Sequence, residues 1–303
     1  MNQIKKFFSK IGFDYLALGV MALLFQIIIL NILNIYNPQY LNSTNLLTIL
    51  SAICNYILPF PIFYWLIKKI PTETFETRNV NAKTFIIYIG IAYTLMWIGN
   101  IIGLIITTLL SGIIQTQIAN PVQNLISSSE IWFNLFIISI LAPVFEEIFF
   151  RKILIDRTIK HGVKLSILLS AVIFALFHGN LNQFFYAFLI GGFFAYVYIK
   201  TGKITYTISL HVIINLMGSV MSVIFTNSVM NIQTNINPFD AFIILAYLLI
   251  LFSLIVIGLY GIFKFKDKLF TKIELPYKCV FLNYGMICFM AFFIFEIIYQ
   301  VFG

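Results

Sequence analysis

Residues 142–152, APVFEEIFFRK, place two adjacent glutamates in a run of alanine, valine, phenylalanine and isoleucine. The rest of the chain is similarly apolar, since 61% of its 303 residues are hydrophobic and only 10% are charged. A water-soluble domain of this length needs far more polar surface. The sequence therefore predicts an all-α, polytopic integral membrane protein, with Glu146 and Glu147 at membrane depth.

Apolar segments long enough to cross a hydrocarbon layer of about 30 Å recur along the chain between polar breaks. We expect eight or nine transmembrane helices, forming a single membrane domain over residues 1–303. The two segments near residues 165–199 are short, because a 16-residue helix reaches only about 24 Å, and we expect them to form a hairpin. The approximate spans are 13–36, 46–67, 84–111, 131–150, 165–178, 183–199, 204–226, 239–263 and 279–302.

The 19 lysines and arginines all fall in every second connection between these spans. Positive charge is retained on the cytoplasmic side of membrane proteins, so this pattern predicts a cytoplasmic amino terminus. It also explains the net charge of +8 by attraction to the anionic inner leaflet, without a nucleic-acid partner. The five basic groups are Lys5, Lys6 and Lys10; Lys68, Lys69, Arg78 and Lys83; Arg151, Lys152, Arg157, Lys160 and Lys164; Lys200 and Lys203; and Lys264, Lys266, Lys268, Lys272 and Lys278.

Ionisable side chains inside the spans are few, and such residues usually point inward and have partners. Glu147 and Arg151 are four residues apart, in the order that favours an ion pair on one helical face. Glu146 lies about 100° around the helix from Glu147 and has no cation at helical spacing. It is the candidate to take a proton from water. Glu296, in the last span, is a further buried acid without a predicted partner.

Two other motifs supply polar groups at a spacing of four residues. Phe174 and His178, in FALFH, share one helical face, so the phenylalanine ring can orient the imidazole and exclude water. His211 and Asn215, in HVIIN, offer N–H donors suited to the oxygen of a tetrahedral intermediate. Glu146 lies only about 7–8 Å along its helix from Arg151 and the basic residues, so we expect a hydrated pocket facing the cell interior.

Together, EEIFFR, FALFH and HVIIN resemble the EExxxR, FxxxH and HxxxN motifs of the CPBP family of intramembrane proteases. This family includes type II CAAX prenyl endopeptidases and bacteriocin-processing or bacteriocin-immunity proteins. The resemblance covers about residues 131–226. It implies a protease that cleaves a membrane-associated or lipidated peptide. In that reading Glu146 and His178 activate water, His211 and Asn215 stabilise the oxyanion, and Glu147, Arg151 and Phe174 support them.

Other functions are consistent with the same residues. A zinc-dependent peptidase could use Glu146, His178 and His211 as ligands, but the short HExxH spacing is absent, so we favour a site without a metal or other cofactor. The remaining alternatives are a bacteriocin immunity or scaffold protein that acts by binding, and a transporter that uses the same buried acids. The lysine- and isoleucine-rich composition is typical of low-GC bacteria, and we expect peptide processing in a bacterial cell membrane. The sequence identifies neither the substrate nor the oligomeric state.

Overall fold

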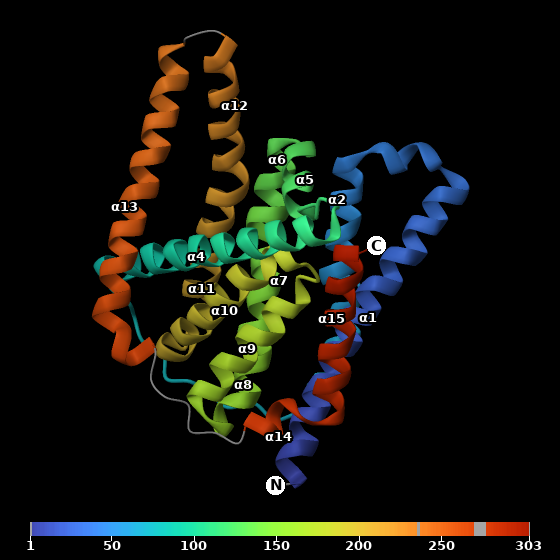
Figure 1. The fold of residues 1–303 in the computed structure, drawn as a ribbon. Coiled ribbons are helices and arrows are strands. Elements are labelled where there is room, and N and C mark those ends of the chain that lie inside the picture. The colour runs from blue at the N-terminus through green and yellow to red at the C-terminus, as the bar shows by residue number, and fades with distance from the viewer. Residues whose placement is uncertain (1, 235–236, 270–276, 303) are drawn as a thin grey trace.

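The computed structural model describes residues 2–234, 237–269 and 277–302 (Figure 1). These residues form helices joined by short connections, and no strand occurs among them. The prediction of an all-α fold is confirmed. Lys272, one of the basic residues counted above, lies outside the described residues.

Eight helical segments within the described residues are long and apolar enough to cross a membrane. They confirm the prediction of a multi-pass membrane protein, and each coincides with a predicted span. A ninth apolar helix, α9 (Val163–Phe177), is shorter, as expected, but its hairpin partner α10 (Leu181–Thr201) has 21 residues and is itself a candidate span. The eight segments are Asn2–Tyr36, Thr44–Ile67, Ala82–Ile114, Ile131–His161, Leu181–Thr201, Ile204–Thr234, Pro238–Phe265 and Tyr284–Phe302.

Three of these segments contain π-helical turns, which are frequent at functional sites. Thr44–Ile67 consists of α2 (Thr44–Ala52), a π turn at Ile53–Ile57, and α3 (Pro59–Ile67). Ile204–Thr234 consists of α11 (Ile204–Leu216), a π turn at Met217–Met221, and α12 (Ser222–Thr234). Ile131–His161 consists of α6 (Ile131–Phe133), a π turn at Asn134–Leu141, α7 (Ala142–Glu147), a π turn at Ile148–Ile153, α8 (Leu154–Thr158) and a 3-10 turn at Ile159–His161.

Pro143 gives a physical reason for the first π turn of the Ile131–His161 segment. Proline has no N–H, and its ring crowds the preceding turn, so regular α-helical bonding is lost around it. Just before it, the N–H of Ala142 donates to the carbonyl of Ile137, five residues back. The wider turn ends at Leu141, so Glu146 and Glu147 lie in the short helix that follows this break in α-helical bonding.

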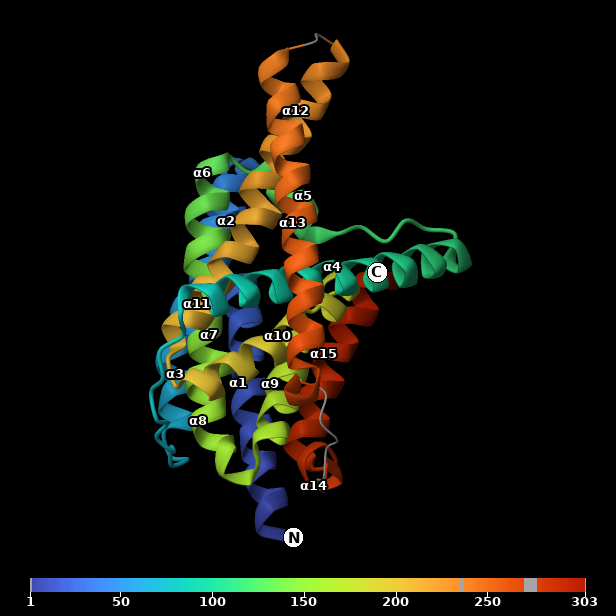
Figure 2. The ribbon, with the colours of Figure 1, turned by 90° about the vertical axis from the view of Figure 1, so that its left-hand side faces the viewer.

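The remaining helices are single pieces. A 3-10 turn, Pro38–Asn42, follows α1 (Asn2–Tyr36). α4 (Ala82–Ile114) crosses the other helices steeply in both views (Figures 1 and 2) and packs against α10 and α13 (Pro238–Leu269), while α10 also packs against α9. α5 (Pro121–Ser128) follows α4, and α14 (Tyr277–Phe281) leads into α15 (Tyr284–Phe302), which packs along α1.

Gly99 allows α4 to come close to α10. A Cβ atom at this position would collide with the Cα and N of Tyr186, so any larger residue would force the two helices apart. Met96 and Asn100, on the same part of α4 as Gly99, line the cavity described below.

Among the described residues, the connections that carry lysine and arginine lie on the lower side of the molecule in Figure 1, towards the amino terminus and α8. The loop between α3 and α4 runs along this side. The N–H of Glu73 donates to the carbonyl of Asp156 at 2.7 Å, and the N–H of Arg78 donates to the carbonyl of Thr201 at 2.7 Å. The connections without lysine or arginine, including 37–43, 115–120 and 178–180, join the opposite ends of the helices.

Candidate active site

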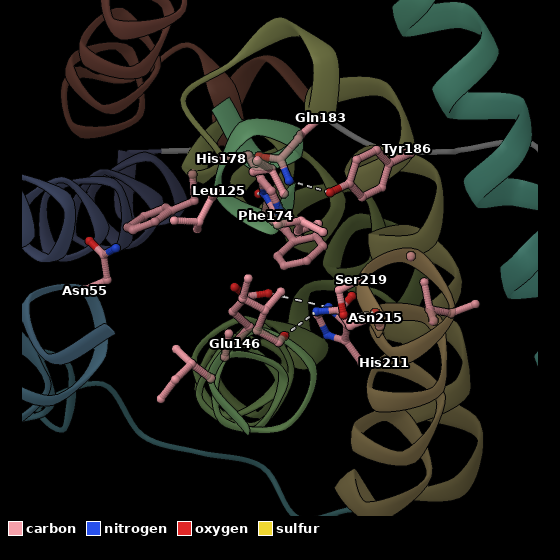
Figure 3. A pocket seen from close by; sticks show the side chains of 18 of the residues that line it. Asn55, Leu125, Glu146, Phe174, His178, Gln183, Tyr186, His211, Asn215 and Ser219 are labelled. Carbon is pink, nitrogen blue, oxygen red and sulfur yellow. Dashed lines mark hydrogen bonds and ion pairs between the residues drawn. The ribbon is translucent and has the colours of Figure 1, made fainter. Parts of the chain in front are cut away.

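A cavity of about 440 Å³ lies where the Ile131–His161 segment, α2, α4, α5, α9, α10 and α11 meet (Figure 3). Five predicted site residues line it: Glu146, His178, His211 and Asn215, and the supporting residue Phe174. They come from three helical segments that are distant in sequence, and Figure 3 shows their side chains around one space. The structure therefore brings together the acid, the two imidazoles and the amide that the motifs singled out.

Below the cavity, Glu147 forms a fully buried pair with Arg151. The Arg151 Nε lies 3.1 Å from Glu147 Oε2, and both side chains have 0% exposure. The Arg151 guanidinium also stacks 4.3 Å from the ring centroid of Phe174 and 5.5 Å from that of Phe194. A cation in an apolar environment gains from such aromatic faces. The predicted Glu147–Arg151 pair is present, and its guanidinium lies beside both rings in the core.

Glu147 has a second partner that the spacing of the sequence did not predict. Its Oε1 lies 2.8 Å from Nδ1 of His211. A carboxylate can only accept, so Nδ1 carries the hydrogen and Nε2 is the nitrogen left for other partners. That atom lies 3.6 Å from Oε2 of Glu146. The two adjacent glutamates thus flank one imidazole, although on a regular helix they point about 100° apart.

Glu146 is the carboxylate that reaches the cavity. Its side chain keeps 15% exposure, against 0% for Glu147. The hydroxyl of Tyr56, in the π turn after α2, donates to Oε1 of Glu146 at 2.6 Å. This short, charge-assisted bond fixes the carboxylate while leaving Oε2 directed towards His211 and the cavity.

His178 lies at the end of α9, where Gly179 turns the chain with a φ of 61°. Its Nδ1 lies 2.8 Å from the carbonyl of Phe174. A carbonyl only accepts, so Nδ1–H donates and Nε2 is the free nitrogen. The Phe174 ring packs edge-on against the imidazole at a centroid distance of 4.8 Å. Phe174 therefore fixes the His178 ring through both its carbonyl and its side chain.

Asn215 is one turn beyond His211 on α11. Its Nδ2 donates to the carbonyl of Ile138 at 2.9 Å, which ties α11 to the π turn ahead of Pro143. An amide nitrogen has two hydrogens, so one N–H is left for a group in the cavity. Ser219, on the following π turn, donates to the Asn215 carbonyl at 2.7 Å and holds that turn in place.

The cavity residues that sequence reasoning missed include Tyr56, Gln183 and Tyr186. Gln183 donates to the Tyr186 hydroxyl at 2.5 Å, and Asn180 donates to the carbonyl of His178 at 2.8 Å, so these residues hold the hairpin tip. No motif links them to His178 and His211. The one available signal was the excess of amide side chains around residues 180–183 of an otherwise apolar hairpin.

Glu296 does not line this cavity. Its Oε2 lies 3.3 Å from the position that a Cβ atom on Gly179 would occupy, so the carboxylate packs against the hairpin tip beside His178. A side chain on residue 179 would press on it, in addition to the strain of the positive φ.

The zinc-site alternative is not matched by a cluster of ligands. Among the described residues, no group of three or more His, Cys, Asp or Glu side chains lies close enough to hold a metal ion. The Nδ1 atoms of His178 and His211 bind a backbone carbonyl and Glu147, as described above. Glu146, His178 and His211, the alternative zinc ligands, line the same cavity but do not form such a group.

The expectation that the pocket faces the basic end of the helices is wrong. Phe149 and Phe150 line the cavity on the Arg151 side of Glu146, and most of the other lining residues lie between Glu146 and the helix ends that lack lysine and arginine. The Ile131–His161 segment contributes Ile137, Ile138, Ala142, Glu146, Phe149 and Phe150, and the rim includes Asn120, Gln123 and Asn182. Sequence distance from Arg151 gave the depth of Glu146 but could not show which way the open space extends.

Comparison with known proteins gives one match. Residues 127–217 match the Rce1-like family, described as type II CAAX prenyl endopeptidase Rce1-like. The matched segment contains all three motifs, and it confirms the resemblance drawn from them. Neither the curated proteins nor the solved structures gave a match to this chain.

Proposed function

With that family match as the premise, we propose that the protein is an intramembrane endopeptidase that hydrolyses a peptide bond in a membrane-associated substrate. The observation that carries the proposal is the convergence of Glu146, His178, His211 and Asn215 on one cavity. Each residue type has a role in peptide hydrolysis.

Glu146 and His178 supply the general base. Glu146 is held by Tyr56 and reaches the cavity, and His178 presents an Nε2 whose orientation is fixed by Phe174. A water molecule between these groups loses a proton to Glu146 as its oxygen bonds to the scissile carbonyl carbon. When the C–N bond breaks, Glu146 gives that proton to the leaving amine. The carboxylate is then ionised again, as at the start of the reaction.

His211 and Asn215 stabilise the charge that develops on the carbonyl oxygen. Asn215 has one N–H left after its bond to Ile138, and His211 donates from Nε2 when the ring carries both hydrogens. Donors fixed in advance in a water-poor site are effective because they need no reorganisation during the reaction. Glu147 and Arg151 act through His211, by holding the position of its ring.

The test compares two glutamates of the same helical segment. Glu146→Gln removes the base while preserving size, and Glu130→Gln changes an exposed glutamate at the start of the segment. Each variant is purified in lipid nanodiscs and incubated with a library of internally quenched peptides. We expect cleavage by the wild type and by Glu130→Gln, and loss of cleavage in Glu146→Gln with normal folding and membrane insertion.

Equal turnover in the Glu146→Gln variant would refute the catalytic role of this residue. The immunity or scaffold alternative makes a different prediction, since protection of the host would survive in the same variant. The metal-dependent alternative predicts that chelation abolishes cleavage and that added zinc restores it.

A further inference from the structure

The cavity leaves the site on the side away from the positive charge of the protein. On α11 the lining runs from His211 to Ser219, away from Lys203. On α10 it runs from Ile190 back to Asn182, away from Lys200. Asn120, just before α5, and Gln123, within α5, are exposed and form part of its rim. Three separate elements therefore give the same direction.

On the opposite side the floor is closed by buried side chains. Tyr15 and Phe63 have 0% exposure, and Phe149 and Phe150 have 2% and 3%. The Tyr15 hydroxyl donates to the Phe149 carbonyl at 2.6 Å, and its ring lies 5.0 Å from that of Phe63. This aromatic layer and the buried Glu147–Arg151 pair separate the cavity from the basic connections.

The chemistry of the wall indicates what kind of chain enters. Among the described lining residues, Glu146 is the one acidic residue, and there is no lysine or arginine. Amide side chains donate and accept, as peptide groups do, so they suit an extended backbone. Capture of a terminal carboxylate takes a cation or a nest of N–H groups. Seven asparagines and glutamines line the cavity: Asn55, Asn100, Asn120, Gln123, Asn182, Gln183 and Asn215.

We propose that the site opens to the extracytoplasmic side of the membrane and receives an internal segment of an exported peptide or of an extracytoplasmic loop. Basic connections are retained in the cytoplasm, so the end of the bundle without them faces outward. The cleavage step rests on the proposed function, whereas the direction of the opening rests on the cavity and the charges alone.

The direction is tested by cysteine labelling in intact cells. The native Cys54, Cys279 and Cys288 are replaced by alanine, and single cysteines are introduced at Gln123 on the rim, Asn100 in the wall and Glu76 in the basic loop. Cells are treated with a small, charged thiosulfonate that does not cross membranes. We expect Gln123→Cys and Asn100→Cys to label fully in intact cells, and Glu76→Cys to label only after permeabilisation.

The reverse pattern would overturn the proposed direction. Because labelling needs no catalysis, it separates this result from failure of the proposed function, which the Glu146→Gln comparison in nanodiscs measures. The substrate class is tested by giving the purified protein one peptide sequence with an amidated or a free carboxyl end. Equal cleavage supports recognition of an internal segment, and a several-fold preference for the free carboxylate contradicts it.

Discussion

Two arginine–glutamate pairs of nearly equal length lie in opposite environments of this protein. Arg151 and Glu147 are 3.1 Å apart with 0% exposure of both side chains, and Arg78 and Glu76 are 3.0 Å apart with 67% and 85% exposure. They form a matched comparison in which burial differs and contact distance does not. We predict that Arg151→Ala is far more destabilising than Arg78→Ala.

The expected magnitudes follow from burial. Removing one partner of a buried pair leaves an uncompensated charge and costs about 3–5 kcal/mol of unfolding free energy. An exposed pair contributes about 0–1 kcal/mol, because water solvates both charges when the pair is broken. Arg151→Ala also removes the stacking of the guanidinium on Phe174, so we expect its loss to lie near the upper end of that range.

The assay is equilibrium unfolding in mixed micelles with increasing sodium dodecyl sulfate, followed by tryptophan fluorescence. A loss in Arg151→Ala that equals the loss in Arg78→Ala would refute the reasoning. A double variant, Glu147→Leu with Arg151→Met, removes both charges and should recover most of the stability. It should still be inactive, because His211 no longer has the carboxylate that holds its Nδ1.

Three further predictions concern the reaction. Asn215→Ala should lower kcat about 100-fold, the usual effect of losing one oxyanion donor, and single-turnover kinetics would measure it. Tyr56→Phe removes the bond to Glu146 and should lower kcat/KM about 10- to 100-fold, since a hydrogen bond to a charged group contributes about 1.5–3 kcal/mol. Unchanged activity would show that the carboxylate needs no such anchor. Exhaustive chelation, with metal content measured on the same sample, should leave turnover unchanged; loss restored by zinc would establish the metal-dependent mechanism.

The sequence predicted the fold class and most helices because membrane insertion is governed by local composition. A segment of about 20 apolar residues forms a spanning helix wherever it occurs, since its backbone groups must bond within the segment. The same locality explains the Glu147–Arg151 pair and the contact between Phe174 and His178, which are each four residues apart on one helix. These features needed no knowledge of how the helices pack.

Contacts between helices could not be predicted in this way. Tyr56 bonds Glu146 across 90 positions, and His211 bonds Glu147 across 64. The sequence placed Glu147 in a supporting role on its own helix, whereas packing made it the partner of His211 as well. The length of α10 was underestimated because the polar residues near its start were assigned to the turn.

The sequence alone determined that this chain is a helical membrane protein with four polar residues suited to peptide hydrolysis, because hydropathy and helical spacing are properties of short segments. The tertiary structure alone decided that those residues share one cavity, and that it opens away from the basic connections. The direction in which the cavity opens depends on side chains from many helices. Here an aromatic layer closes the side of Glu146 that faces the basic connections, and amide side chains line the other side. That arrangement is set by packing at close approach, such as α4 against α10 at Gly99, and no periodicity along the chain records it.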